Sequence, residues 1–255
     1  MILAIDVGNT NIVIGCCENG KIAFSERIST SREGTALEYA ISFKTILELY
    51  NIKHSDIDGA IISSVVPSVT STIKQAIKKI TDIDAKVVGP GTKTGLNIVI
   101  DNPAQLGSDL VVDAVAGISE YPLPLIIFDM GTATTAAVID SNGCYLGGMI
   151  IPGVNVSLNA LTAGTSQLPK INLEPPKKMI GSNTIDCMKS GIIFGQASMI
   201  DGIIDRFEEE LGKKCTVIAT GGLSGCIMPY CKRKVIHDKD LLLKGLIKIF
   251  EKNKN

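Results

Sequence analysis

The sequence contains no tryptophan, and only 4% of its 255 residues are aromatic. Aromatic platforms on which nucleic-acid bases stack are therefore not expected. The formal net charge of −1 also provides no broad electrostatic attraction for nucleic acid. We expect no nucleic-acid partner.

Long hydrophobic runs are also missing. No stretch reaches the roughly 18 apolar residues that a membrane span requires, so we expect no membrane association. The first apolar segment ends at Asp6 and has no basic residues before it, which indicates a buried strand and not a signal peptide. Together these features predict a cytoplasmic protein.

Residues that bind structural zinc are scarce. The chain has two histidines, and its seven cysteines include no Cys-x-x-Cys pair. This spacing argues against a structural zinc site. We expect the cysteines to be buried, reduced thiols, which are typical of cytoplasmic proteins.

The chain is rich in hydrophobic residues, which make up 45% of it against 20% charged residues. That content is sufficient for a packed core and excludes disorder. A chain of 255 residues forms one large domain or two small ones.

A short motif occurs once in each half of the chain. The first copy is Asp6-Val7-Gly8-Asn9-Thr10-Asn11, and the second is Asp129-Met130-Gly131-Thr132-Ala133-Thr134. Each follows an apolar run and precedes another. Glycine lets the backbone approach a phosphate, small polar residues can donate hydrogen bonds to it, and the aspartate can hold Mg²⁺. One copy alone is equally consistent with an ordinary hairpin, but two copies favour a nucleotide site.

The hydrophobic pattern predicts a similar order of elements in both halves, three antiparallel strands followed by alternating helices and strands. This order predicts an α/β protein with two mixed sheets. In the first half we expect strands near 2–7, 12–15, 21–27, 58–67 and 86–88, and helices over 36–51, 68–80 and 104–120. In the second half we expect strands near 122–127, 134–140, 144–151 and 214–219, helices over 191–211 and 240–252, and a long insert over 152–190.

A third glycine turn follows the strand predicted near residues 214–219. It consists of Thr220-Gly221-Gly222, and it is suited to approach the adenosine part of a nucleotide. The chain has neither a Gly-x-x-x-x-Gly-Lys-Ser/Thr loop nor a Gly-x-Gly-x-x-Gly motif, which disfavours P-loop and Rossmann folds.

Asp109 begins a predicted helix within Gly107-Ser108-Asp109-Leu110. A carboxylate there can accept the proton of an acceptor hydroxyl during phosphoryl transfer. Its alternative role is that of a first-turn acid favoured by the helix dipole, and spacing alone favours this second role. Elsewhere, we expect a surface turn at His237-Asp238 and a solvated loop at 232–234.

Taken together, the motifs resemble the type III pantothenate kinases of the actin/hexokinase/sugar-kinase superfamily. The segments that carry the resemblance are Asp6–Asn11, Ser64–Pro67, Asp101–Pro103, Gly107–Asp109, Asp129–Thr135, Gly147–Gly153, Leu168–Pro169, Gly181–Thr184, Ser190–Gly191 and Thr220–Leu223. The resemblance implies a duplicated, mixed-sheet actin-like ATPase fold with ribonuclease H-like halves. It implies an N-terminal half over 1–115 and a C-terminal half over 116–255 that carries the acceptor and dimer insert.

The resemblance also implies an activity, the transfer of the ATP γ-phosphate to pantothenate in the first step of coenzyme A biosynthesis. The implied cofactors are ATP, Mg²⁺ and a monovalent cation, K⁺ or NH₄⁺. A homodimer is implied as well, with the acceptor site near the subunit interface.

The resemblance assigns roles to individual residues. The ATP phosphates are assigned to Asp6, Val7, Gly8, Asn9, Thr10, Asn11, Ile12 and Val13, with Asp6 near Mg²⁺. Thr132 is assigned to ATP and Asp129 to the monovalent cation. Asp109 is assigned the role of general base within the pantothenate-binding segment Gly107, Ser108, Asp109 and Leu110, and Thr184 also contacts pantothenate.

Two departures from the family pattern fall on the pantothenate side. Where the family has Gly-Ala-Asp-Arg, this chain has Gly107-Ser108-Asp109-Leu110, so leucine replaces the arginine. Where the family has a tyrosine before Asp-Asn-Pro, this chain has Ile100. Losing a charge-assisted hydrogen bond weakens binding by ~1.5–3 kcal/mol. Two alternatives therefore stay open, a kinase with an altered acceptor and a non-catalytic, nucleotide-binding regulatory relative.

Overall fold

The computed structural model describes residues 1–254, and these form two compact units. Unit 1 contains Met1–Leu96, Asp101–Ser119 and the segment that begins at Asp240. Unit 2 contains Asn97–Ile100 and Glu120–Lys239. The predicted boundary between residues 115 and 116 concerns the duplicated halves of the sequence and stays a prediction.

Unit 1 is built on a five-stranded sheet with the strand order β3-β2-β1-β4-β5. The central strand β1 is antiparallel to β2 and parallel to β4. The strands are β1 (Ile2–Val7), β2 (Asn11–Glu18), β3 (Lys21–Ser29), β4 (Gly59–Ser64) and β5 (Lys86–Val87).

Unit 2 repeats this arrangement in a six-stranded sheet with the order β11-β10-β7-β8-β9-β6. Strand β7 is antiparallel to β8 and parallel to β10, so β7 is the counterpart of β1. The strands are β6 (Asn97–Ile98), β7 (Leu125–Met130), β8 (Ala133–Ile139), β9 (Cys144–Pro152), β10 (Thr216–Thr220) and β11 (Ile236–His237). The predicted duplication of mixed sheets is confirmed by this shared topology.

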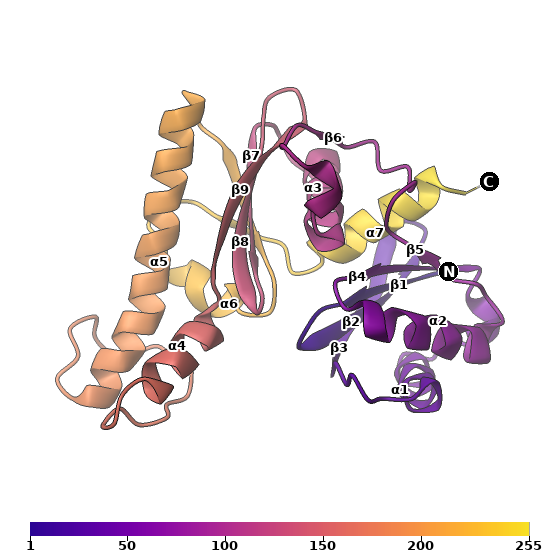
Figure 1. The fold of residues 1–255 in the computed structure, drawn as a ribbon, viewed down its shortest axis with the longest axis horizontal. Helices are drawn as coiled ribbons and strands as arrows, with labels where there is room; N and C mark the ends of the chain where they lie inside the picture. The colour runs from indigo at the N-terminus through magenta and orange to yellow at the C-terminus, as the bar shows by residue number, and fades with distance from the viewer. Residues whose placement is uncertain (255) are drawn as a thin grey trace. The chain divides into compact units, whose positions relative to one another are not determined.

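Helices cover both faces of the unit 1 sheet (Figure 1). One face packs against α1 (Ala36–Leu49) and α2 (Pro67–Thr81), and the other against α7 (Leu241–Lys252). A capping box between Thr35 and Glu38 starts α1, and a proline in its first turn starts α2. The predicted helices at these positions are confirmed to within a few residues.

The core of unit 2 lies between its sheet and the long helix α5 (Thr184–Leu211), with α4 (Val154–Ala163) beside it. The predicted start of α5 at residue 191 is wrong. Asn183 caps the helix further upstream, where its side chain accepts a hydrogen bond from the Asp186 N–H. Two further helices are α3 (Ser108–Glu120) and the short α6 (Ser224–Ile227). The 3₁₀ helices of the two units are η1 (His54–Asp56), η2 (Pro103–Gln105) and η3 (Met228–Tyr230).

Of two expectations for the C-terminal part of unit 2, the surface turn at His237-Asp238 is wrong and the solvated loop at 232–234 is confirmed in part. Asp238 is 7% exposed and accepts a 2.7 Å hydrogen bond from the Tyr121 hydroxyl, so it does not lie in a surface turn. Residues 232–234 lie in a loop, as expected, and Lys232 and Lys234 are exposed, but Arg233 forms ion pairs with Glu208 and Asp205. Neither contact had a sequence signal, because each joins residues far apart in the chain.

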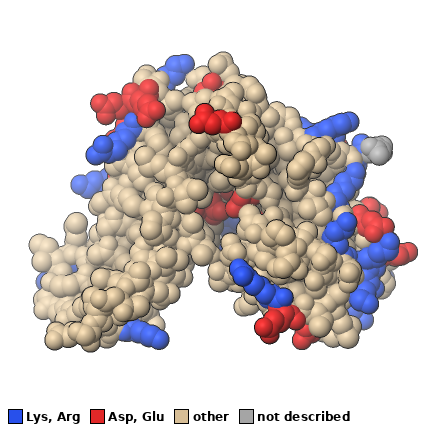
Figure 2. Space-filling view, viewed as in Figure 1, with Lys and Arg blue, Asp and Glu red and all other residues tan. Residues whose placement is uncertain are grey.

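The cysteines also differ from expectation, because only Cys16 and Cys17 are buried and Cys187 is exposed. Charged side chains of both signs are interspersed on the face shown in Figure 2. Within residues 1–254, no helix is long and apolar enough to cross a membrane.

Candidate active site

The first Asp-x-Gly motif forms a tight hairpin between β1 and β2. The Gly8 N–H donates to the Asn11 carbonyl at 3.0 Å, and the Thr30 hydroxyl donates to the Gly8 carbonyl at 2.7 Å. Asp6 lies near the carboxyl end of β1 and is half-buried. Val7 and Ile12 are fully buried, so they support the hairpin from within the core.

The second motif forms the equivalent hairpin between β7 and β8. The Gly131 N–H donates to the Ala133 carbonyl, again at 3.0 Å. The strand register makes this turn one residue shorter, because Met130 pairs with Thr134 whereas Val7 pairs with Ile12. The two hairpins are therefore related in form but present different numbers of turn residues.

The Thr-Gly-Gly turn lies directly beside the second aspartate. Thr220 is the register partner of Asp129 on the neighbouring parallel strand. Gly221 follows with φ of +86°, and a Cβ there would collide with Asp129 Oδ1 and the Met130 backbone. Glycine is thus required at 221 both for its backbone conformation and for the close approach to Asp129.

Oxygen atoms lie on both sides of Asp129 in the sheet. Thr135 is its partner on β8 and Thr220 its partner on β10, and register partners share a face. The Thr135 hydroxyl is buried and has no hydrogen-bond partner among residues 1–254. A buried, unpaired hydroxyl beside a carboxylate is suited to a further ligand such as a cation or water.

A hydroxyl network joins α3 to the end of β4 in unit 1. Ser108 Oγ lies 3.0 Å from Ser63 Oγ and donates to the Ser64 carbonyl at 3.2 Å. Ser63 is completely buried and is the register partner of Asp6. The network therefore holds the start of α3 close to the strand ends that carry the first hairpin.

Asp109 is the second residue of α3 and is half-buried. Burial raises the pKa of its carboxyl, although the Leu110 N–H, which donates to Oδ1 at 2.9 Å, acts in the opposite direction. A Cβ at Gly107 would collide with Asp109 Oδ1. Gly107 therefore makes room for the Asp109 carboxylate in its present position.

The other predicted residues lie elsewhere in these units. Ile100 belongs to unit 2, 3.8 Å from where a Cβ on Gly147 would be. Thr184 is the exposed first residue of α5, and Thr132 is exposed in the second hairpin. Sequence reasoning missed Arg32, whose guanidinium lies 3.5 Å from Asn9 Oδ1 beside the first hairpin, because no motif marks it.

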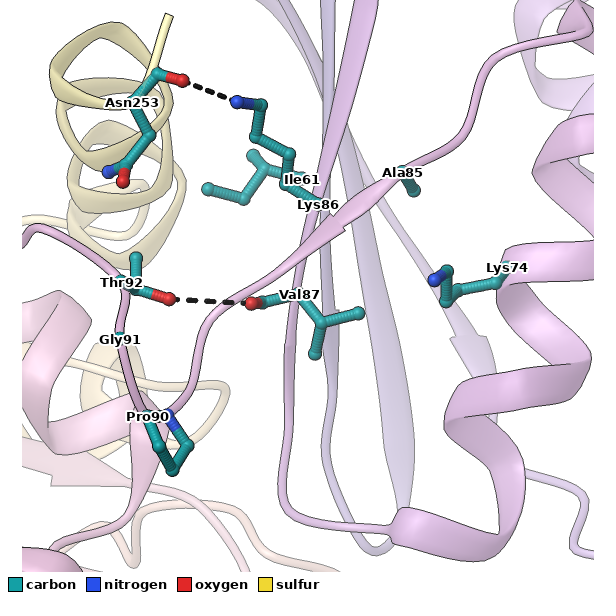
Figure 3. A pocket seen from close by; sticks show the side chains of 9 residues that line it. All are labelled: Ile61, Lys74, Ala85, Lys86, Val87, Pro90, Gly91, Thr92 and Asn253. Atoms are coloured by element: carbon teal, nitrogen blue, oxygen red, sulfur yellow. Dashed lines mark hydrogen bonds between the residues drawn. The ribbon is translucent and has the colours of Figure 1, made fainter.

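A cavity of about 440 Å³ lies in unit 1 away from all of these residues (Figure 3). Its lining includes Lys74 from α2 and Lys86 from β5, and the Lys86 ammonium donates to the Asn253 carbonyl. None of the predicted site residues lines it. The residues of the two hairpins and of α3 therefore lie outside this cavity.

No group of three or more His, Cys, Asp or Glu side chains within residues 1–254 is arranged to hold a metal ion. Mg²⁺ bound with a nucleotide needs only one or two protein carboxylates, because phosphates and water supply the other ligands. A single carboxylate such as Asp6 fits that mode of binding.

Two similar mixed sheets, each with an Asp-x-Gly hairpin at its central strand, define an actin-like ATPase fold. A family model described as type III pantothenate kinase matches residues 2–206. The chain belongs to the type III pantothenate kinase family, and membership makes it a kinase that uses ATP and a divalent metal.

Similar proteins of known name support this membership. The type III pantothenate kinase of Halalkalibacterium halodurans is 43% identical, with 99% of this chain and 100% of that protein covered. That of an Exiguobacterium species is 44% identical, with 99% of each chain covered.

Solved structures with lower identity support the fold alone. A conserved putative Baf family transcriptional activator from Campylobacter jejuni has a TM-score of 0.61 at 19% identity, with 98% of both chains covered. A putative N-acetylglucosamine kinase from Porphyromonas gingivalis has a TM-score of 0.50 at 13% identity, with 99% of both covered.

Proposed function

We propose that this protein transfers the γ-phosphate of ATP to the primary hydroxyl of pantothenate, giving 4′-phosphopantothenate and ADP in the first step of coenzyme A biosynthesis. The observation that carries the proposal is the 43% identity over 99% of the chain to a named type III pantothenate kinase. The retained Asp6, Asp109 and Asp129 support an active enzyme and not a non-catalytic relative.

The ATP phosphates contact the first hairpin, Asp6–Val13. The backbone of Gly8 and the side chains of Asn9, Thr10 and Asn11 supply hydrogen-bond donors, while Asp6 contributes a carboxylate to Mg²⁺. Arg32 extends this site, because a guanidinium beside Asn9 is a suitable partner for phosphate oxygens.

Asp129 holds a monovalent cation, K⁺ or NH₄⁺, and Thr132 contacts ATP from the same hairpin. The unpaired buried hydroxyl of Thr135 supports the cation, because it lies beside Asp129 in the sheet register. Gly221 and Gly222 contact the nucleotide from the neighbouring turn. The cation contributes positive charge close to the nucleotide phosphates when it is bound.

Asp109 acts as the general base. As the pantothenate hydroxyl oxygen bonds to the γ-phosphorus and the bond to ADP breaks, the Asp109 carboxylate accepts the hydroxyl proton. The half-buried position of Asp109 and its raised pKa support this role, because a more basic carboxylate is a better proton acceptor. The family resemblance assigns pantothenate binding to Gly107, Ser108 and Leu110 of unit 1 and to Ile100 and Thr184 of unit 2.

A kinase with an altered acceptor is the second candidate, and Leu110 favours it. An aliphatic side chain provides no charge-assisted bond to the carboxylate of pantothenate. Phosphorus NMR of the reaction mixture separates the two candidates. A pantothenate-dependent monoester resonance supports the first, whereas ADP formation only with other alcohols supports the second.

We also propose a cytoplasmic homodimer. Exposed apolar side chains occur in two segments of unit 2, because Ile150 in β9 is 80% exposed and Met179 and Ile180 in the insert before α5 are 62% and 88% exposed. The face over α4 carries few charged side chains in Figure 2. Exposed apolar side chains such as these are typical of a protein interface. Analytical ultracentrifugation of Ile150→Glu tests the proposal, since a monomer is expected from the variant and a dimer from the unchanged chain.

A further inference from the structure

His237 and Ser224 are joined by a hydrogen bond next to the Thr-Gly-Gly turn of unit 2. Ser224 is completely buried, and its Oγ lies 2.9 Å from His237 Nε2. His237 lies in β11, where it is the register partner of Ala219, just before that turn. The proposed function assigns His237 no role.

A second neighbour of the Ser224 hydroxyl sets the direction of its hydrogen bond with His237. Ser224 Oγ lies 2.7 Å from the Gly221 carbonyl oxygen, which can only accept a hydrogen bond. The Ser224 hydroxyl therefore donates to Gly221, and His237 must donate its Nε2–H to Ser224 Oγ. The Ser224 backbone N–H donates to the same carbonyl at 3.3 Å, so both lone pairs of the Gly221 oxygen are engaged.

These bonds fix the orientation of the peptide between Gly221 and Gly222. A peptide between two glycines has several accessible orientations, because neither residue has a Cβ to restrict it. The peptide is planar and trans, so its N–H points away from its carbonyl. With the Gly221 carbonyl directed at Ser224, the Gly222 N–H points in the opposite direction, and Gly222 is exposed. Gly221 itself is packed against Asp129.

We propose that Ser224 and His237 are positioning residues for the nucleotide, an inference that rests on the proposed function. Their two hydrogen bonds in series select the peptide orientation in which the Gly222 N–H is presented as a fixed donor to ATP. A preorganised donor binds its ligand without the cost of ordering it first. Neither side chain is required to touch ATP.

Isothermal titration calorimetry tests this. A non-hydrolysable ATP analogue is titrated into the protein in the presence of Mg²⁺ and K⁺. His237→Ala is expected to raise the dissociation constant about three- to tenfold. Ser224→Ala is expected to do at least as much. His237→Gln is expected to bind like the unchanged protein, because its amide can donate to Ser224 Oγ. In steady-state assays KM for ATP should rise in His237→Ala while KM for pantothenate stays within about twofold.

Tyr121→Phe is the matched control. It removes the 2.7 Å hydrogen bond to Asp238, the residue next to His237, and leaves the Ser224 bonds in place. It should lower the melting temperature without changing analogue affinity. The inference is wrong if His237→Ala binds normally, if His237→Gln is as weak as His237→Ala, or if Tyr121→Phe weakens binding equally. Absence of binding by the unchanged chain would overturn the proposed function together with this inference.

Discussion

The hydroxyl oxygens of Ser63 and Ser108 lie 3.0 Å apart in unit 1. Ser63 is the register partner of Asp6, and Ser108 immediately precedes Asp109. This contact therefore ties the strand end that carries the proposed phosphate-binding hairpin to the helix start that carries the proposed base.

Replacing Gly107 with alanine should impair catalysis more than nucleotide binding. A Cβ at this position collides with Asp109 Oδ1, so the carboxylate must move. A displaced general base is expected to lower kcat by about tenfold or more, while the dissociation constant for ATP stays unchanged. Gly202→Ala is the control, because a Cβ there meets nothing within 4 Å. Equal effects of the two variants on kcat would contradict the proposed crowding of Asp109.

The pH dependence of kcat/KM should report on Asp109. Only the ionised carboxylate can accept the hydroxyl proton, and burial raises its pKa above the ordinary value of 3.8. Activity should therefore decline, as pH falls, at a higher pH than it would with an unperturbed aspartate. An acidic limb at or below pH 3.8 would show that the carboxyl is not desolvated in the enzyme.

Asp109→Asn should not destabilise the protein at neutral pH. A raised carboxyl pKa means that the fold disfavours the ionised form, so above that pKa the charge opposes folding. The neutral amide removes this cost, and the melting temperature at pH 7 should stay equal or rise although activity is lost. A clear fall in melting temperature would indicate that Asp109 stabilises α3.

The buried Glu208 carboxylate should stabilise unit 2 through its ion pairs with Arg233 and the exposed Lys214. The Glu208 side chain is 5% exposed. Burial by itself raises the carboxyl pKa, but hydrogen bonds from Lys214, the Cys215 N–H and Arg233 outweigh burial and lower the pKa to about 2. A lowered carboxyl pKa adds stability above the unfolded value of about 4.3, and this stability is lost as pH falls toward 2.

Glu208→Gln should therefore lower the free energy of unfolding by about 1–2 kcal/mol at pH 7, with a smaller difference at pH 3. Urea denaturation at both pH values measures this. Lys44→Ala, which breaks an exposed pair with Glu48, is the control and should cost at most about 0.5 kcal/mol. A Glu208→Gln effect that does not shrink with acid would contradict the ion-pair account.

Leu110→Arg should improve recognition of pantothenate. An arginine next to Asp109 supplies a charge-assisted bond to the pantothenate carboxylate, so KM for pantothenate should fall about tenfold. Leu110→Gln, which is polar but uncharged, should give little change. If Leu110→Arg leaves KM unchanged, the missing arginine does not limit acceptor binding.

Much of the fold is predictable from the sequence, because its strands and helices have clear hydrophobic periods. The sequence does not predict the two-residue strands β6 and β11, although it predicts β5, which is equally short. The early start of α5 also escapes prediction. It depends on the Asn183 cap, which precedes the buried stripe of the helix by several residues.

The site is predictable only in part. The hairpins at Asp6 and Asp129 follow from local sequence, and the family resemblance supplies a role for Asp109. The bonds from Ser108 to Ser63 and from Ser224 to His237 could not be predicted, since each joins separate elements through side-chain hydroxyls. Hydroxyl residues are common on all surfaces, so their partners become apparent only in three dimensions.

The most direct test of the central claim is an ADP-release assay with pantothenate, Mg²⁺ and K⁺, run on the unchanged chain and on Asp109→Asn. We predict pantothenate-dependent ADP release by the unchanged chain. Asp109→Asn should reduce it by about a hundredfold or more while the ATP analogue still binds. ATP binding without any pantothenate-dependent ADP release by the unchanged chain would contradict the account.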